Sequence, residues 1–203
     1  MGGRKLKFLM CDTSEGIADS PSEEEWVASP IQCLDKAVEW EPKIIVVSFI
    51  RISIREREAL VELSTALKRN SHTKRCSVMA LLHSKHRKLI EELKLGKVDY
   101  VRYIGEAKLD SNLVREIIAD MGAGDSLDRH LETLCPFLHY SKIDSQQEMT
   151  VCGAYLDRMV LGGRCLHELC ETDDHLYCEY YQHPSRRWRC RIRRPERYPP
   201  ERS

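Results

Sequence analysis

The chain has 203 residues, and its 32 Lys and Arg residues balance 32 Asp and Glu residues, so the formal net charge at pH 7 is zero. That balance excludes a bulk electrostatic attraction to nucleic acid or to anionic membranes. No apolar stretch approaches the length of a transmembrane helix, and the basic first residues precede too short an apolar run for a secretory signal. We therefore expect a soluble, cytoplasmic protein with no membrane partner.

Four apolar runs in the first 125 residues predict β-strands. They cover residues 7–11, 43–50, 76–83 and 98–104. The run 43–50 (KIIVVSFI) is unbroken and rich in β-branched residues, which is typical of a central strand covered on both faces. Residues 23–29 (EEEWVAS) are a candidate for an additional, irregular strand.

Helical patterns separate the predicted strands. Apolar residues recur at helical spacing within residues 30–40, 55–68, 84–95 and 110–121. In the first pattern they are Ile31, Leu34 and Val38, and Gly96 is placed to end the third helix. Strands alternating with helices predict an α/β fold with a parallel sheet flanked by helices and joined by right-handed crossovers.

The nine cysteines mark a compositional break near residue 125. Three are scattered through the first part, whereas six crowd the last third: Cys135, Cys152, Cys165, Cys170, Cys178 and Cys190. A disulfide framework suits secreted proteins, and an odd count leaves at least one thiol unpaired. In a cytoplasmic protein this concentration favours metal binding over disulfides.

The order and spacing of the first elements resemble the receiver domain of bacterial response regulators. The stretches AVEWEPKIIVVSFIRIS and LKLGKVDYVRYI are similar to that family's helix, proline and central strand, and to its glycine turn before the last strand. The resemblance covers roughly residues 5–121 and implies a receiver-like (flavodoxin-like) domain over residues 1–122. The segment between Asp12 and Pro30 is short for the family's usual first helix and second strand.

The phosphotransfer chemistry of receivers does not carry over to this sequence. A receiver binds magnesium through an acidic pair after its first strand and phosphorylates an aspartate at the end of its third strand. Here the pair is reduced to Cys11 and Asp12, the acceptor position falls on Ser48, and the switch and lysine positions fall near Leu82 and Tyr103. One carboxylate makes a poor magnesium site, and serine is not an acyl-phosphate acceptor.

We therefore expect a pseudo-receiver, a receiver scaffold without phosphotransfer. Asp12 is either a surviving functional acid or, more simply, an exposed loop aspartate. The resemblance implies a signalling role through contact with a protein partner, which could be a second copy of the chain. The face formed by the last strand and helix is the expected contact surface.

A linker helix over residues 123–134 leads to a cysteine-rich domain over residues 135–184. About 50 residues bury little surface, so a metal or a cross-link would help such a domain to fold. Zinc ribbons usually supply ligands in pairs roughly two to four residues apart, and the chain has no C-x-x-C pair. Widely spaced cysteines beside aromatic and apolar residues suit an iron–sulfur cluster at least as well.

The cysteine-rich segment also resembles a small cysteine domain of anaerobic bacteria and archaea. Four cysteines match it and are the predicted metal ligands, called here the cysteine set: Cys135, Cys152, Cys170 and Cys178. The preferred cofactor is a 4Fe-4S cluster and the alternative is zinc, while buried free cysteines that act as small hydrophobic residues remain a third interpretation. Less favoured substitute ligands are His139, His167 and His175.

The last residues, 185–203, form an Arg- and Pro-rich tail. Arginine beside an aromatic residue is a weak candidate for nucleic-acid binding, but a disordered or partner-docking tail is preferred because the rest of the chain is not basic. The candidate residues are Arg186, Arg187, Trp188 and Arg189.

The sequence contains no recognisable catalytic motif: no G-x-S-x-G, no Walker loop, no G-x-G-x-x-G and no H-E-x-x-H. We therefore expect a non-enzymatic regulatory or adaptor protein whose cysteine-ligated cluster is structural or senses redox state. The alternatives are an electron-transfer subunit of a redox complex and a zinc-stabilised interaction protein.

Overall fold

The computed structural model describes residues 7–13, 24–105, 107–144, 146–155 and 159–183. They form two compact units. The first contains the described residues up to Glu132 together with Lys142–Glu148, and the second contains Thr133–Ser141 and the described residues from Met149 onward. The Arg-rich tail with its candidate nucleic-acid residues lies outside the described residues. No helix in the described part of the chain is both long and apolar enough to cross a membrane.

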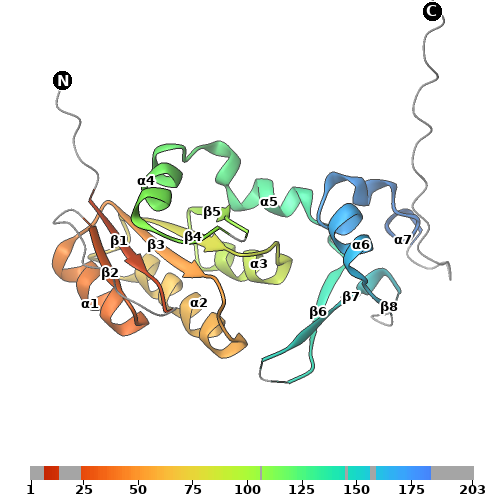
Figure 1. Ribbon diagram of the computed structural model, residues 1–203, viewed down its shortest axis with the longest axis horizontal. Coiled ribbons are helices and arrows are strands. Elements are labelled where there is room, and N and C mark those ends of the chain that lie inside the picture. Colours follow the sequence, from red (N-terminus) through yellow and green to blue (C-terminus); the bar gives the residue numbers. More distant parts are fainter. Residues whose placement is uncertain (1–6, 14–23, 106, 145, 156–158, 184–203) are drawn as a thin grey trace, which may run out of the picture. The chain divides into compact units, whose positions relative to one another are not determined.

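A parallel five-stranded sheet forms the centre of the first unit, with the strand order β2–β1–β3–β4–β5 (Figure 1). The strands are β1 (Phe8–Cys11), β2 (Glu24–Val27), β3 (Ile44–Phe49), β4 (Ser77–Leu82) and β5 (Tyr100–Tyr103). This is the order of flavodoxin-like doubly wound folds. The predicted receiver-like α/β fold is therefore confirmed.

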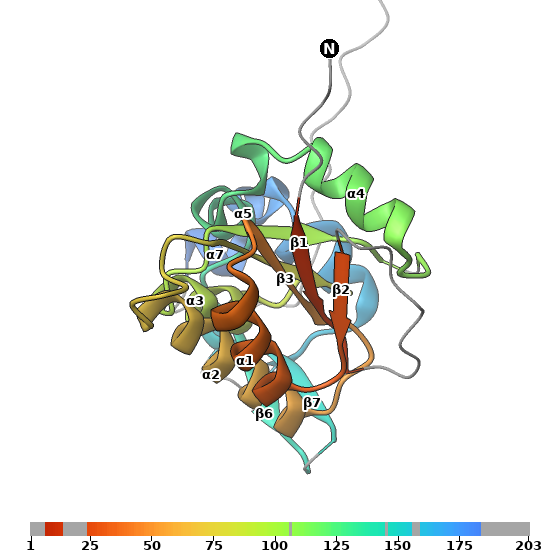
Figure 2. The same ribbon diagram turned by 90° about the vertical axis from the view of Figure 1, so that its left-hand side faces the viewer.

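Four helices flank this sheet, as the sequence pattern predicts. They are α1 (Pro30–Trp40), α2 (Ile54–Arg69), α3 (Arg87–Leu95) and α4 (Ser111–Ala119). Figure 2 shows α1, α2 and α3 on one side of the sheet and α4 on the other. Every residue of β3 is buried, because this strand has neighbours on both edges and helices on both faces. Because both faces of β3 are covered, its sequence is a nearly continuous apolar run, which is the pattern that predicted a central strand.

Each of these four helices is preceded by a residue whose side chain accepts a hydrogen bond from the helix's first turn. Ser53 and Glu56 form a capping box at the start of α2, and Asp110 caps α4. In α3 the cap is His86, whose Nδ1 accepts a hydrogen bond from the Leu89 backbone N–H. These caps place the first turns of α2 and α3 at the carboxyl ends of β3 and β4.

The buried face of α1 differs from the predicted apolar stripe. Cys33 and Ala37 are fully buried, whereas Ile31 is 75% exposed. Leu34 and Val38 of the predicted stripe are half-buried. Small side chains allow a helix backbone to approach a sheet closely, so the two small residues take the most buried positions. The Cys33 thiol also hydrogen bonds with the thiol of Cys11 in β1.

The candidate strand after residue 23 is a regular parallel strand. In the parallel pairing of β1 with β2, Phe8 lies beside Glu24 and Cys11 lies beside Val27. The short segment before Pro30 therefore does supply a second strand. Its first residue is a buried glutamate, Glu24, whose carboxylate forms an ion pair with Arg115 of α4. The ion pair compensates for the burial of the carboxylate.

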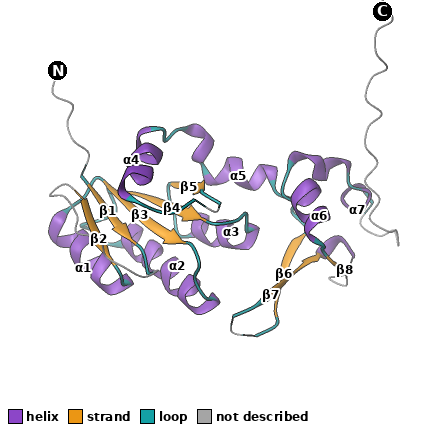
Figure 3. Cartoon of the chain, viewed as in Figure 1, coloured by secondary structure: helices purple, strands orange, loops and turns teal. Residues whose placement is uncertain are grey.

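The chain between the two sheets forms a short 3-10 turn, η1 (Ala123–Asp125), and helix α5 (Leu127–Thr133). A three-stranded sheet follows in the order β6–β7–β8, made of β6 (Leu138–Lys142), β7 (Glu148–Cys152) and β8 (Met159–Val160). Figure 3 shows that the second unit combines these strands with short helices. The helical segments are η2 (Gly153–Tyr155), α6 (Gly163–Cys165), η3 (Leu166–Cys170), η4 (Asp173–Tyr177) and α7 (Glu179–Gln182).

Candidate functional site

The receiver-like positions lie at the carboxyl ends of β1 and β3, which are neighbours in the sheet. Asp12 directly follows β1, and its backbone N–H donates a hydrogen bond to the carbonyl of Val27. Ser48 lies in β3, next to Leu81 of β4 in the register. Asp12 is therefore the one carboxylate that these two positions contribute.

Ser48 is fully buried and its hydroxyl has no hydrogen-bond partner among the described residues. Side chains alternate between the two faces of a strand, so Ser48 shares the face of Ile44 and Val46, which pack against α4. A side chain in this apolar layer is shielded from solvent. The predicted switch and lysine positions, Leu82 and Tyr103, are the last residues of β4 and β5.

The cysteine set comes from four different elements of the second unit. Cys135 follows α5, and Cys152 is the last residue of β7. Cys170 ends η3, and Cys178 precedes α7. A backbone hydrogen bond of 2.8 Å from the Cys135 N–H to the Cys170 carbonyl joins two of these elements.

All members of the cysteine set line one narrow cavity, called here the cysteine cavity. Its volume is about 10 Å³, which is room for roughly one water molecule. The thiol of Cys170 hydrogen bonds with that of Cys135, and this contact, together with burial, raises the pKa of Cys170. The structure thus brings the four predicted ligands, which are up to 43 positions apart in the sequence (178 − 135), to one place.

An apolar shell surrounds the cysteine cavity. Its side chains are Phe137, Ala154, Met159, Leu161, Leu169, Tyr180 and Tyr181. None of the three histidines considered as substitute ligands lines the cavity. His175, for example, is buried against Tyr181 and donates from Nδ1 to the carbonyl of Thr172. Cys165 does not line the cavity either.

The thiols of the cysteine set line one cavity, but they do not point toward a common centre as metal ligands do. Within the described residues, no group of three or more His, Cys, Asp or Glu side chains is placed so that it could hold a metal ion. The donor type and the shared cavity fit a thiolate-ligated metal, but the side chains would have to turn toward a common centre to bind one.

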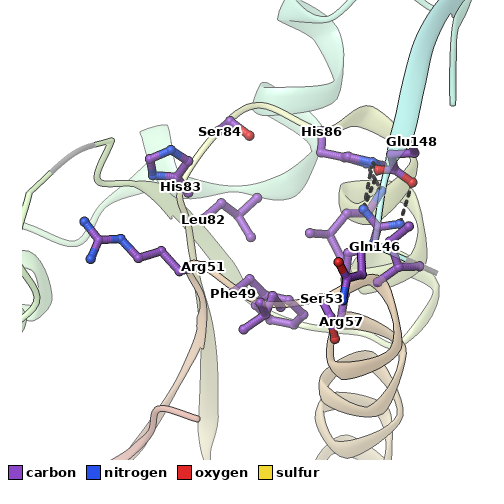
Figure 4. Close-up of a pocket in the computed structure, with 13 residues that line it drawn as sticks. Phe49, Arg51, Ser53, Arg57, Leu82, His83, Ser84, His86, Gln146 and Glu148 are labelled. Carbon is purple, nitrogen blue, oxygen red and sulfur yellow. Dashed lines mark hydrogen bonds and ion pairs between the residues drawn. The ribbon is translucent and has the colours of Figure 1, made fainter. Parts of the chain in front are cut away.

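The first unit contains a second cavity, at the carboxyl ends of β3 and β4 (Figure 4), called here the β3–β4 pocket. Its volume is about 290 Å³. The apolar part of its wall comes from Phe49, Ile52, Ile54, Leu82 and Leu89. Carboxyl ends of parallel strands are where ligands usually bind in open α/β sheets.

One side of the β3–β4 pocket is closed by three charged or polar side chains (Figure 4). Arg57 of α2 donates two hydrogen bonds to the carboxylate of Glu148, at 2.6 and 2.8 Å. His86 lies 2.5 Å from the same carboxylate through Nε2. Because Nδ1 of His86 accepts the cap hydrogen bond from Leu89, the proton of the neutral ring lies on Nε2 and is donated to Glu148.

The environment of this cluster shifts two pKa values downward. The hydrogen bonds from Arg57 lower the pKa of Glu148 to about 2, although burial opposes them. Burial lowers the pKa of His86, against the opposing effect of Glu148. At neutral pH the cluster therefore pairs a charged guanidinium and a carboxylate with a neutral imidazole.

The sequence-based prediction missed Arg57, His86 and Glu148. They belong to three elements separated by 29 and 62 residues, so no local motif connects them. The one available signal was the place of His86 shortly after a predicted strand. That position is common for functional side chains in parallel sheets.

No family model matches the chain, and no curated protein matches it. Among solved structures, the chain is similar to a response regulator from Desulfuromonas acetoxidans, at 18% sequence identity and a TM-score of 0.38. The similarity covers 57% of this chain and 95% of that chain. Likeness at this level says nothing about activity, so the fold assignment depends on the strand order and helix placement of the chain itself.

Proposed function

We propose that this protein is a non-enzymatic regulatory or adaptor protein, in which a receiver-like unit contacts a protein partner and a cysteine unit is held together by a metal ion. The observation that carries the proposal is the convergence of the cysteine set on one cavity. A fold by itself does not fix a function. The function is therefore inferred from the residues at the two sites.

Two features of the cysteine unit support a metal. Its secondary structure consists of short strands and short helices, which bury little surface and gain most from a cross-link. Its four cavity-lining thiols come from separate segments, so one metal ion would tie all of them together. Metal binding and folding are then coupled, as in small zinc domains.

The dimensions of the cysteine cavity favour a single zinc ion over the 4Fe-4S cluster preferred from the sequence. Four sulfurs bound at about 2.3 Å to a tetrahedral zinc lie roughly 3.8 Å from one another. The thiols of Cys135 and Cys170 already hydrogen bond with each other, as two ligands of one ion would have to be neighbours. A cubane of irons and sulfides would have to separate the thiols and widen a cavity of about 10 Å³.

The proposal that the receiver-like unit is a pseudo-receiver is supported by Ser48. A phosphorylated side chain must be reached by a phosphodonor and by magnesium, and Ser48 is fully buried. Its hydroxyl also lacks the carboxylate chemistry of an acyl-phosphate acceptor. A binding role therefore suits this unit better than phosphotransfer.

Metal content tests the proposal directly. We would purify the full chain without oxygen and measure zinc, iron and sulfide per chain for three proteins: the wild type, Cys170→Ser and the control Cys165→Ser. We expect about one zinc per chain in the wild type and in the control, and a large loss in Cys170→Ser, because thiolates are the ligands.

The other outcomes are equally informative. Iron and sulfide in equal amounts, lost in Cys170→Ser, would replace zinc by a cluster and make a redox role the better proposal. The absence of any metal from all three proteins, or an equal loss in the control, would contradict a site made by the cysteine set.

A further inference from the structure

Glu148 reaches the β3–β4 pocket from the segment Lys142–Glu148, called here the turn segment, which belongs to the first unit. Its carboxylate is nearly enclosed, with the side chain 17% exposed, and the guanidinium of Arg57 is 16% exposed. The bidentate arrangement is the strongest and most directional way in which a protein binds a carboxylate. The chain therefore supplies its own carboxylate to this site.

The donors of this site are held by their own helices. His86 keeps its orientation because its Nδ1 caps α3, and Arg57 lies in the first turn of α2, where its backbone N–H donates to Ser53. Neither restraint involves Glu148. The His86 ring would therefore keep its orientation if another carboxylate took the place of Glu148, and the Arg57 guanidinium, 3.0 Å from Nε2 of that ring, would start from the same helix position. The imidazole donor of this carboxylate site is thus preorganised.

The turn segment is held against the rest of the first unit mainly through the ion pair of Glu148 with Arg57 and its hydrogen bond with His86. Its other described residues are all exposed: Lys142, Ile143, Asp144, Gln146 and Gln147. A second ion pair joins Lys142 to Glu58 of α2, but both side chains are more than half exposed, and such pairs contribute little. Segments with few buried contacts detach locally at low free-energy cost.

The β3–β4 pocket beside the carboxylate site has room for a further side chain. Its volume of about 290 Å³ is near the lower end of typical ligand cavities. One wall is apolar, and Arg51 and His83 lie on the side away from Glu148 (Figure 4). An acidic side chain with an apolar neighbour matches this combination of charge and surface.

We propose that Arg57 and His86 form a receptor for an acidic side chain of a partner protein, and that Glu148 is its competitor within the chain. The partner's carboxylate replaces that of Glu148, and an apolar residue beside it enters the β3–β4 pocket. This inference rests on the interaction role proposed above but not on the metal. It assigns the contact to the pocket at the strand ends, whereas the sequence-based expectation placed it on the face of the last strand and helix.

A labelled synthetic peptide with the sequence of residues 141–151 of this chain tests the proposal, because it offers the same carboxylate in solution. Its binding to the full-length protein is measured by fluorescence anisotropy. We expect Glu148→Gln, which weakens the internal competitor without changing its shape, to bind the peptide at least tenfold more tightly than the wild type. Glu58→Gln is the matched control, because it removes the exposed ion pair of the same segment, and we expect it to resemble the wild type.

Two further variants show whether the peptide uses the proposed donors. In the Glu148→Gln background, Arg57→Gln or His86→Asn should weaken peptide binding, and a peptide carrying Gln in place of its Glu should bind poorly to every variant. Asn at position 86 still caps a helix, so folding is preserved. Equal affinity of wild type and Glu148→Gln, or undiminished binding of the Gln peptide, would overturn the proposal. Metal content is unaffected by these substitutions, so this failure is distinct from a failure of the proposed metal site.

Discussion

Ser48 lies in β3, the central strand of the sheet, at the position where a phosphorylated receiver has its acceptor. Its side chain is fully buried among apolar neighbours and its hydroxyl has no hydrogen-bond partner among the described residues. A buried hydroxyl without a partner loses its hydration and gains nothing in return. Thr73 is also fully buried, but its hydroxyl donates to the carbonyl of Leu67 at 2.7 Å.

Removing these two hydroxyls should have opposite effects. We expect Ser48→Ala to leave the free energy of unfolding unchanged or to raise it by about 1 kcal/mol, because an unsatisfied group is removed. The shape-conserving Thr73→Val should lower it by about 1 kcal/mol or more, because a buried hydrogen bond is lost. Urea unfolding of both variants measures the difference. A loss in Ser48→Ala as large as that in Thr73→Val would show that the Ser48 hydroxyl is bonded after all.

At the scale of the element, helix α3 depends on His86 in two ways. The ring caps the helix through Nδ1 and donates to Glu148 through Nε2. The cap requires an unprotonated Nδ1, so the ring serves both functions together only as the neutral tautomer with its proton on Nε2. Protonation of Nδ1 would remove the acceptor that caps the helix. The charged groups that face the ring are Glu148, which favours protonation, and Arg57, which opposes it.

The sign of the resulting pH effect follows from the lowered pKa of His86. The unfolded chain binds a proton near the ordinary value of 6.5, whereas the folded chain binds it only at lower pH. The free energy of unfolding therefore decreases as the pH falls below 6.5. Glu148 has the depressed pKa of a paired carboxylate, so its stabilisation is present above 4.5 and is lost as the pH falls from 4.5 toward about 2.

We expect His86→Asn to lose less stability than the wild type when the pH falls from about 7 to about 5, because asparagine caps α3 without titrating. The free energy of unfolding of each protein at several pH values gives the slopes. Asn in place of the exposed His72 is the control for the loss of a histidine. Parallel curves for the wild type and His86→Asn would show that His86 does not respond to pH in this range.

The elements themselves were largely predictable, because their signals are local. The strand β3 was visible as an apolar run, and α2 as a stripe of Leu60, Leu63 and Leu67, all of which are buried. The buried face of α1 was not visible, because Cys33 and Ala37 are small and their burial depends on how closely the helix approaches the sheet. The strand β2 was ambiguous, because it contains a glutamate whose burial depends on the distant Arg115.

On the scale of the whole molecule, the two units differ in what holds them together. The first has a continuous apolar core between a parallel sheet and its helices. The second has two small apolar clusters, and each of them contains members of the cysteine set. If the proposed metal binds there, the second unit should depend on it for stability, whereas the first unit should not.

At this scale, the sequence predicted the members of the cysteine set but not the dimensions of their cavity. Flanking aromatic and apolar residues, together with the resemblance to a small cysteine domain, selected four of the cysteines in the last third, and these four line the cysteine cavity. The width of that cavity bears on the choice between zinc and a cluster. This width depends on packing between separate segments, so it cannot be predicted from local sequence. The carboxylate site of Arg57 and His86 was missed for the same reason.

X-ray absorption at the metal edge of the purified full-length protein is the most direct test of a metal held by the cysteine set. It reports the element, the type of ligand atom and the metal–ligand distance in one measurement. The account predicts zinc with four sulfur ligands at about 2.3 Å. A zinc signal dominated by nitrogen or oxygen ligands, or no metal bound by sulfur, would contradict it.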